Sequence, residues 1–279
     1  MNQINQETVA GGLLKRIVLL LGALLIIVPV SIVVLASFKT TAELFQKPLG
    51  LPSGLNLDNY ISMFREQAIG QYFMNSVVVT LVTIFLILLF SSLLSYAIYR
   101  FTGWVGLVLY GLFAAGMMVP PQVNMIPIYS LVSKLGLTNS ITGLIAVSTS
   151  VFMPVAVFIL SGFMKTLPKE MIESGSIDGA NEWKMYTRIV LPITLPSLSA
   201  SAIFLSVMIW NDLLYPLLFI NSNAKKTLPL ALLQFQGEYL TNYPMIFAGV
   251  VIASAPMVIA YVFLQRFFVE GVTAGSVKG

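Results

Sequence analysis

The side chains that could do chemistry in this sequence are carboxylates, lysines, arginines and hydroxyls, because the chain contains no histidine and no cysteine. Imidazole and thiolate catalysis and zinc sites built from His or Cys ligands are therefore excluded. The densest group of ionisable residues lies at 165–195. Within it, Glu170 and Glu173 are three positions apart and Asp178 and Glu182 are four apart, the helical spacing that a pair of hydrolase carboxylates would need.

The charges of this segment balance, which favours a different interpretation. Four bases accompany the four acids, namely Lys165, Lys169, Lys184 and Arg188. Equal numbers of both signs indicate surface ion pairing rather than a catalytic pair. Apolar residues share helix faces here, for example Trp183 and Tyr186. We expect two short helices around a turn at Gly179, with Asn181 capping the second. They either dock into a groove of a partner or rest on the bilayer or on the protein's own helices.

A second candidate group consists of Trp210, Asn211, Asp212 and Tyr215, which lie in a long apolar stretch. Asp212 follows Pro196 by about 16 residues, or about 24 Å of helix. A carboxylate in a membrane-spanning helix is rare, and it usually faces the bundle interior or a water-filled path. Asn and aromatic side chains also suit hydroxyl-rich sugars. The alternative is a structural hydrogen bond between helices.

The composition places the whole chain in a lipid bilayer. Of its 279 residues, 57% are hydrophobic and only 9% are charged, whereas a soluble domain has about 25% charged residues. So little charge cannot cover a surface that faces water. The net charge of +4 does not indicate nucleic-acid binding, because the basic residues are spread singly along the chain.

Long uncharged runs separate these charges, and each run is long enough for a helix of about 20 residues to cross the membrane. The sequence predicts an all-α polytopic protein in a single domain, 1–279. Six spans are expected near 15–36, 72–100, 104–121, 141–164, 195–220 and 246–268. Strands are not expected, because the runs show no alternation of the barrel type. The first run could be a cleaved signal peptide, but it exceeds the usual apolar length of about 7–15 residues, which favours a retained span.

The basic residues predict the orientation. With six spans both termini lie on one side, and Lys and Arg are more frequent on that side. Several directly abut the span ends, namely Lys15, Arg16, Arg100, Lys165 and Arg266. The positive-inside rule then places both termini and the segment 165–192 in the cytoplasm.

The spacing of this segment resembles the EAA loop of ABC importer permeases. That motif runs from a Glu through a Gly to Ile-x-Leu-Pro, and the corresponding residues are Glu173, Gly179, Ile189, Leu191 and Pro192. Ser174 and Gly175 stand where the motif has two alanines, so other small residues replace them. Asp178-Gly179-Ala180 matches a common variant of the motif.

Two further stretches resemble carbohydrate permeases in particular. Trp210-Asn211-Asp212, followed by Pro216-Leu217, is similar to their Trp-Asn-acidic segment. The end of the chain, 265–279, resembles the C-terminus of the second permease subunit of maltose-type transporters. The resemblance extends over the chain in span count and loop order, and it is most specific over 165–279.

The resemblance implies a set of partners. Such a subunit pairs with a homologous permease subunit, two ABC ATPase subunits and an extracytoplasmic sugar-binding protein, in a bacterial-type cytoplasmic membrane. It implies that the EAA segment, Trp183 included, couples to the ATPase. It also implies that the tail 269–279, with Gly271, Thr273, Gly275 and Lys278, reaches between the ATPase subunits. The loop 221–245, with Phe235, Gln236 and Tyr239, resembles the loop that meets the binding protein, although a loop packed on itself would fit equally.

The chain contains no GxxxxGK[ST] phosphate loop, so we expect no ATPase site, no cofactor and no metal on it, with ATP and magnesium held by the partner subunits. The rival interpretation is a stand-alone secondary transporter or channel. Such a protein needs intramembrane charges for ion coupling, and only Asp212 is available. It also has no use for the segment 165–195.

Overall fold

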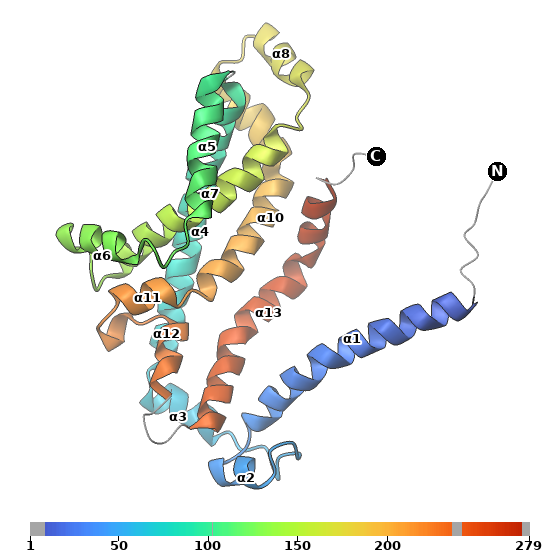
Figure 1. The fold of residues 1–279 in the computed structure, drawn as a ribbon, viewed down its shortest axis with the longest axis vertical. Coiled ribbons are helices and arrows are strands. Elements are labelled where there is room, and N and C mark those ends of the chain that lie inside the picture. Colours follow the sequence, from blue (N-terminus) through green and yellow to red (C-terminus); the bar gives the residue numbers. More distant parts are fainter. Residues whose placement is uncertain (1–8, 102, 236–241, 275–279) are drawn as a thin grey trace. The chain divides into compact units, whose positions relative to one another are not determined.

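The computed structural model describes residues 9–101, 103–235 and 242–274, and all regular structure in these ranges is helical (Figure 1). Five helices are long and apolar enough to cross a membrane. They are α1 (Val9–Ala36), α4 (Ile69–Arg100), α7 (Ile141–Met164), α10 (Leu191–Trp210) and α13 (Tyr243–Ala274). Each covers much of one range expected from the sequence, and α7 has the bounds expected for it.

The third expected range, 104–121, contains the shorter helix α5 (Trp104–Met118). Its 15 residues span about 22 Å at 1.5 Å per residue. The helix stops before Pro120 and Pro121, because proline removes a backbone donor and restricts the residue before it. Val119 is accordingly extended. The prolines therefore end this helix close to the expected bound at residue 121, and they leave it below the length of a typical span.

The expected helix 195–220 is wrong at both ends. The helical backbone begins at Glu182, passes through a π-helix at Met185–Val190 and continues as α10 to Trp210. Pro192 lies in the first turn of α10, where its missing N–H costs little. A break follows Trp210, and the separate helix α11 (Leu214–Phe219) takes up the chain again. Asp212 therefore lies in the break and not within a spanning helix.

Short helices connect the long ones. Those of the loops are α2 (Thr41–Gln46), α3 (Asp58–Glu66), α6 (Met125–Lys134), α8 (Lys169–Ile177), α9 (Glu182–Lys184) and α12 (Leu228–Leu232), with 3₁₀ turns at Asn223–Lys225 and Leu233–Phe235. The sequence predicted α8, as the first of two short helices around Gly179. It also predicted a second short helix after Gly179, but α9 is only the beginning of the long helical segment that ends at Trp210.

The chain divides into two compact units. The first comprises the residues up to Ala68 together with Gln234–Ser254. Its loop is held by the buried amine of Lys39, which donates to the carbonyls of Lys47 (2.8 Å) and Pro48 (3.1 Å). The backbone N–H of Ser53 donates to the Glu43 carboxylate, and this hydrogen bond lowers the pKa of that carboxyl.

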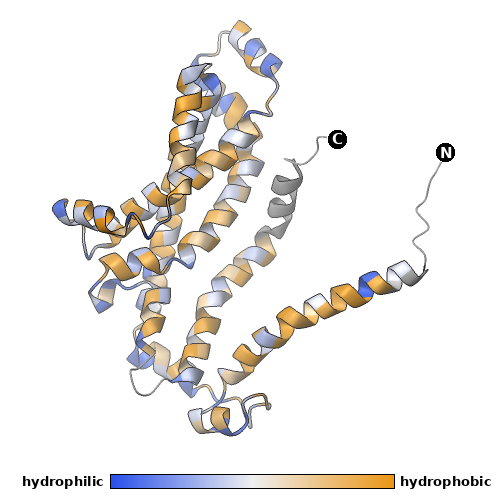
Figure 2. Ribbon diagram, in the orientation of Figure 1, coloured by the Kyte–Doolittle hydropathy of each residue, from blue (hydrophilic) through white to orange (hydrophobic). Residues whose placement is uncertain are grey.

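The second unit, Ile69–Leu233 and the residues from Ala255 onward, contains the main apolar core. Its centre is formed by Ile87 of α4, Leu144 and Ala156 of α7 and Leu205 of α10, all fully buried. Outside this core, large apolar side chains remain exposed along the long helices. Figure 2 shows by colour that hydrophobic residues predominate on these helices. Exposed apolar surface of this extent suits a lipid environment.

The expected tail 269–279 is in part helical. The backbone of α13 continues to Ala274, so residues 269–274 belong to the last long helix. Gly271 and Thr273 lie on this helix, whereas Gly275 and Lys278 lie outside the described residues.

Candidate functional site

The short helix α8 packs closely against the π-helix, and Gly175 makes this approach possible. A Cβ atom at Gly175 would lie 2.8 Å from Cδ1 of Ile189 and 2.8 Å from Cε of Met185. Met185 and Ile172 are buried in the same cluster. The glycine that replaces the second alanine of the motif is therefore the point at which α8 rests on the long helical segment.

The turn after α8 forms as the sequence predicts. Gly179 has a φ of +77°, in the left-handed region that glycine adopts without strain. The N–H of Ala180 donates to the carbonyl of Gly175 (3.0 Å) and closes the turn. Asn181 then caps the next helix, because its side-chain oxygen accepts from the N–H of Lys184 (2.9 Å).

The last turns of α4 hold the start of this next helix. Nε of Arg100 donates to Oε2 of Glu182 (3.0 Å), and a second guanidinium nitrogen contacts Oε1. The hydroxyl of Tyr96 donates to the same carboxylate. One helical turn deeper, the hydroxyls of Ser92 and Tyr186 are hydrogen-bonded (2.7 Å). The sequence interpretation missed these contacts, which join residues more than 80 positions apart. The available signal was Arg100, a lone base at the end of an uncharged run.

The apolar residues of the segment divide into a buried group and an exposed group. Ile172, Met185 and Tyr186 rest on the protein's own helices. Trp183 is 65% exposed and Ile177 is 86% exposed. The Trp183 ring contacts Tyr186 at 5.8 Å between centroids, so one edge of the indole is supported while the rest faces outward. An apolar surface therefore remains open beside the turn at Gly179.

The other carboxylates of the segment lie on its surface. Glu170, Glu173 and Asp178 are exposed, and within the described ranges the Glu173 carboxylate makes no hydrogen bond or ion pair. The Ser174 hydroxyl donates to the carbonyl of Met171 in its own helix (3.1 Å). Leu191 is partly buried and Pro192 is exposed at the start of α10.

The structure places the residues of the group around Asp212 in different surroundings. Asp212 accepts from the N–H of Leu214 (3.1 Å), and the Asn211 amide donates to the carbonyl of Val207 (2.8 Å), so both stabilise local turns. Tyr215 is buried in the core, edge-on to Phe152 at 6.4 Å. Trp210 is buried edge-on to Phe73 at 5.7 Å.

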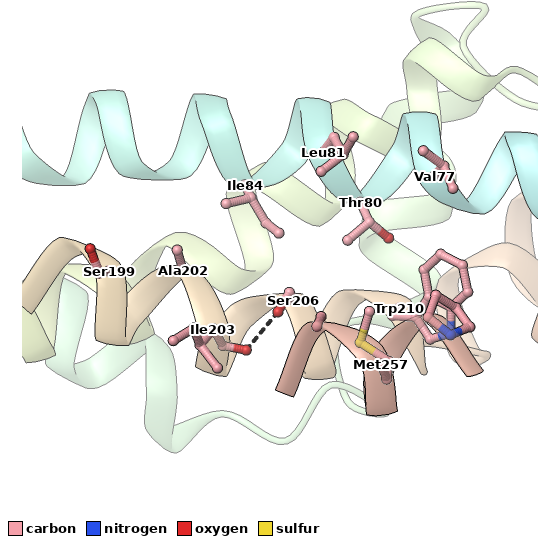
Figure 3. A pocket seen from close by; sticks show the side chains of 12 residues that line it. Val77, Thr80, Leu81, Ile84, Ser199, Ala202, Ile203, Ser206, Trp210 and Met257 are labelled. Atoms are coloured by element: carbon pink, nitrogen blue, oxygen red, sulfur yellow. Dashed lines mark hydrogen bonds between the residues drawn. The ribbon is translucent and has the colours of Figure 1, made fainter. Parts of the chain in front are cut away.

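Trp210 also lines a pocket of about 460 Å³ in the second unit (Figure 3). Its walls come from α4, α10 and α13, and they are mostly apolar. The walls carry only a few polar side chains, which are hydroxyls and include those of Thr80 and Ser206. The Ser206 hydroxyl donates to the carbonyl of Ile203 (2.7 Å), and Thr80 Oγ1 is buried without a partner among the described residues. Sugars need several convergent polar groups, so this wall alone does not form a sugar site.

A loop at the opposite end of α4 is fixed by two asparagines. The Asn75 amide donates to the carbonyls of Ala224 and Lys226 (2.9 Å each). Asn139, which has a φ of +50°, accepts at its side-chain oxygen from the N–H groups of Asn221 (3.1 Å) and Ser222 (3.0 Å). The loop 221–228 is therefore anchored to the starts of α4 and α7. Of the residues expected to contact a binding protein, Phe235 is buried, and Gln236 and Tyr239 lie outside the described residues.

Comparison with known proteins shows that the chain matches the model of one protein family. Residues 87–274 match the model of the family described as "Binding-protein-dependent transport system inner membrane component". The matched range includes the C-terminal part of α4 from residue 87 onward, the segment 165–192 and all of the following helices.

Several named proteins are similar to the chain over almost their whole length. The arabinooligosaccharides transport system permease protein AraQ of Halalkalibacterium halodurans is 37% identical over 263 residues, which cover 92% of this chain and 93% of that protein. The melibiose/raffinose/stachyose import permease protein MelC of Bacillus subtilis is 31% identical, covering 95% and 97%. The multiple sugar-binding transport system permease protein MsmG of Streptococcus mutans is 32% identical, covering 95% and 96%.

Solved structures share the fold at low identity. A chain in the crystal structure of a bacterial ABC transporter involved in the import of the acidic polysaccharide alginate superposes with a TM-score of 0.81. It is 17% identical, and the match covers 96% of this chain and all of that one. A chain of the alginate transporter in complex with its alginate pentasaccharide-bound periplasmic protein gives a TM-score of 0.67 at 15% identity, covering 95% and 96%.

Proposed function

The chain belongs to the family of binding-protein-dependent transport system inner membrane components, and on this premise we propose that it is a permease subunit of an ATP-driven carbohydrate importer. Three relatives at 31–37% identity are named for arabinooligosaccharides, for melibiose, raffinose and stachyose, and for multiple sugars. Their common chemistry is a short carbohydrate. We propose an oligosaccharide as the substrate class of this chain.

The proposed topology has six spans with both termini in the cytoplasm. The five long helices would be spans, and α5 would be the sixth, because about 22 Å of helix can cross a locally thinned or protein-lined part of the bilayer. The basic residues at the span ends support this orientation. It places α8 and Arg100 in the cytoplasm and the loop 221–228 outside.

The segment 165–192 would couple this chain to an ATPase subunit. The observation that carries this proposal is an open apolar surface on a rigid base. Trp183 and Ile177 are exposed, while Gly175 and Glu182 fix the same segment to the π-helix and to α4. A partner cleft that receives α8 would bury the exposed side chains. Glu173, which is exposed, would then form a charge-assisted hydrogen bond with the ATPase.

The remaining partners follow from this role. A homologous permease subunit would supply the other half of the pathway, two ATPase subunits would hold ATP and magnesium, and an extracytoplasmic sugar-binding protein would deliver the substrate. Closure of the ATPase dimer would draw the two coupling segments together and alternate access between the two sides. The chain itself would hold no cofactor and perform no catalysis.

Two further regions of the chain would contact partners in this assembly. The end of α13 and the residues after it, with Gly271, Thr273, Gly275 and Lys278, would approach the ATPase subunits. Loop residues near Phe235, Gln236 and Tyr239 would meet the binding protein. Of the pathway candidates, Trp210 has the best placement, because it alone lines the pocket between α4, α10 and α13. Asn211, Asp212 and Tyr215 make local or core contacts instead.

A deletion strain tests the proposed function. Cells without this chain should lose uptake of at least one of radiolabelled arabinotriose, raffinose and maltotriose, and a plasmid copy should restore it. A tagged copy should also co-purify with a homologous permease and an ATPase. Unchanged uptake of all three sugars together with purification as a lone protein would contradict the proposal.

A further inference from the structure

The helix α4 makes specific polar contacts at both of its ends. At its start, the Asn75 amide holds the carbonyls of Ala224 and Lys226 at 2.9 Å, and the buried Ser76 hydroxyl accepts from the N–H of Leu228 (2.8 Å). These residues fix the loop 221–228 to the first turns of α4. A displacement of this loop would therefore act directly on the helix.

At the other end, α4 holds the second half of the segment 165–192, which is the proposed coupling segment. Ser92 pairs with Tyr186, and Tyr96 and Arg100 both contact the Glu182 carboxylate. Tyr96 and Arg100 are four residues apart and therefore share one face of the helix. A movement of α4 would carry residues 182–186 with it.

The helix between these two ends is built to be stiff. Among the long apolar helices that the structure describes, α4 alone has no internal proline, whereas the others contain Pro29, Pro154, Pro196 and Pro256. Proline removes a helix hydrogen bond and permits bending. Asn75 and Arg100 are 25 residues apart, about 38 Å along a straight helix. In contrast, α7, which begins shortly after the loop-contacting Asn139, contains Pro154 near its middle.

We infer that α4 is the rod that joins the outer loop 221–228 to the coupling segment, with Asn75 and Arg100 as its positioning residues at the two ends. The inference rests on the proposed function, because it assigns to one helix the signal that the binding protein must send to the ATPase. Docking of the binding protein would shift the loop, α4 would move with it, and Arg100 would reposition the helix that starts at Glu182.

The test is the ATPase activity of the complete complex in proteoliposomes, measured with and without the sugar-binding protein and one of arabinotriose, raffinose or maltotriose. Asn75→Ala and Arg100→Ala should each reduce the stimulated rate about fivefold or more, which is the size of effect expected when coupling between two sites is lost. The unstimulated rate should stay within about twofold of wild type. Ser150→Ala is the matched control, because that hydroxyl donates only to Ala146 in its own helix, and it should not change either rate.

The double variant decides whether the two ends act as one device. If α4 is the rod, Asn75→Ala with Arg100→Ala should be no worse than the more affected single variant, because either change already breaks the same connection. Losses that multiply would overturn the inference, as would normal stimulation in Asn75→Ala. If the wild-type complex shows no stimulation at all, the proposed function fails and the rod is not at issue.

Two further variants guard against a simple assembly defect. Asn75→Asp keeps the size of the side chain and removes both N–H donors, so it should reduce stimulation as Asn75→Ala does. The exchange Arg100→Glu with Glu182→Arg re-forms the ion pair with reversed polarity, and it should restore at least about half of the stimulation lost in Arg100→Ala. An assembled Asn75→Asp complex with full stimulation, or an exchange variant with none, would overturn the inference.

Discussion

Two nitrogens of the Arg100 guanidinium donate to the Glu182 carboxylate. This ion pair connects the last turn of α4 to the first turn of the long helical segment that ends at Trp210. The two side chains are 35% and 64% exposed, so the pair contributes at most about 1 kcal/mol to stability. Its consequence is geometric. The planar fork fixes the orientation of the helical segment that starts at Glu182 relative to the end of α4.

Larger side chains at Gly175 should separate α8 from the π-helix. The atoms that a Cβ would meet are the ends of the Ile189 and Met185 side chains, which can move slightly. Gly175→Ala should therefore keep uptake within about twofold of wild type, whereas the branched side chain of Gly175→Val should cost about 1–3 kcal/mol of packing and remove most uptake.

The measurement is sugar uptake together with the amount of permease in the membrane. Gly111→Val is the matched control, because a Cβ at Gly111 meets no atom within 4 Å. Equal losses in Gly111→Val and Gly175→Val would argue against a special role for the contact beneath α8.

Substitutions at Gly179 test backbone conformation instead of packing. A Cβ there would meet no atom within 4 Å, but the φ of +77° is strained for residues with side chains. Asn tolerates this region and Val does not, with a cost of about 1–2 kcal/mol. Gly179→Asn should therefore transport like wild type, and Gly179→Val should transport poorly. Similar uptake by the two variants would show that the turn is not held in this conformation.

Much of the helical framework could be predicted from the sequence. The uncharged runs located the long helices, because charge is expelled from stretches that face lipid. Pro120 and Pro121 located the end of α5, and Gly179 and Asn181 located a turn and a cap. These are local signals, and each depends on the chemistry of one or two neighbouring residues.

The errors concern features that depend on distant contacts. The break after Trp210 contains no proline or glycine at residues 211–213; the first proline after it is Pro216 within α11, and the adjacent Tyr215 enters the core. The contact of Arg100 with Glu182 joins residues 82 positions apart. Asn75 likewise meets carbonyls about 150 positions away. A hydropathy pattern contains no information about which loop a single polar side chain will reach.

Trp183 and Tyr186 should separate docking from stability. Trp183 is exposed, so Trp183→Ser should leave thermal stability unchanged and reduce retention of the ATPase about fivefold or more, as expected for an aromatic anchor. Tyr186 is buried and bonded to Ser92. Tyr186→Phe should keep the ATPase and lower stability by about 1 kcal/mol.

Pull-down of the ATPase by the tagged permease pair and a melting curve in detergent give both readouts from one preparation. If Trp183→Ser retains the ATPase as well as wild type does, the partner does not use the exposed surface beside Gly179.

Asp212 should behave as a turn residue. Its carboxylate accepts from the N–H of Leu214, and an amide oxygen can do the same. Asp212→Asn should leave uptake kinetics and substrate range unchanged, whereas Asp212→Ala should lower stability by about 1 kcal/mol through loss of the acceptor. An altered substrate range in Asp212→Asn would instead place this carboxylate in the sugar pathway.

We expect this chain to transport sugar only as one part of an ATP-driven complex. The most direct test of this expectation is sugar uptake into proteoliposomes that contain this chain, its partner permease and the ATPase, with binding protein outside and ATP inside. We expect uptake to require all five components, and to be absent when any one is left out. Uptake by this chain alone, driven by an ion gradient without ATP, would contradict the account.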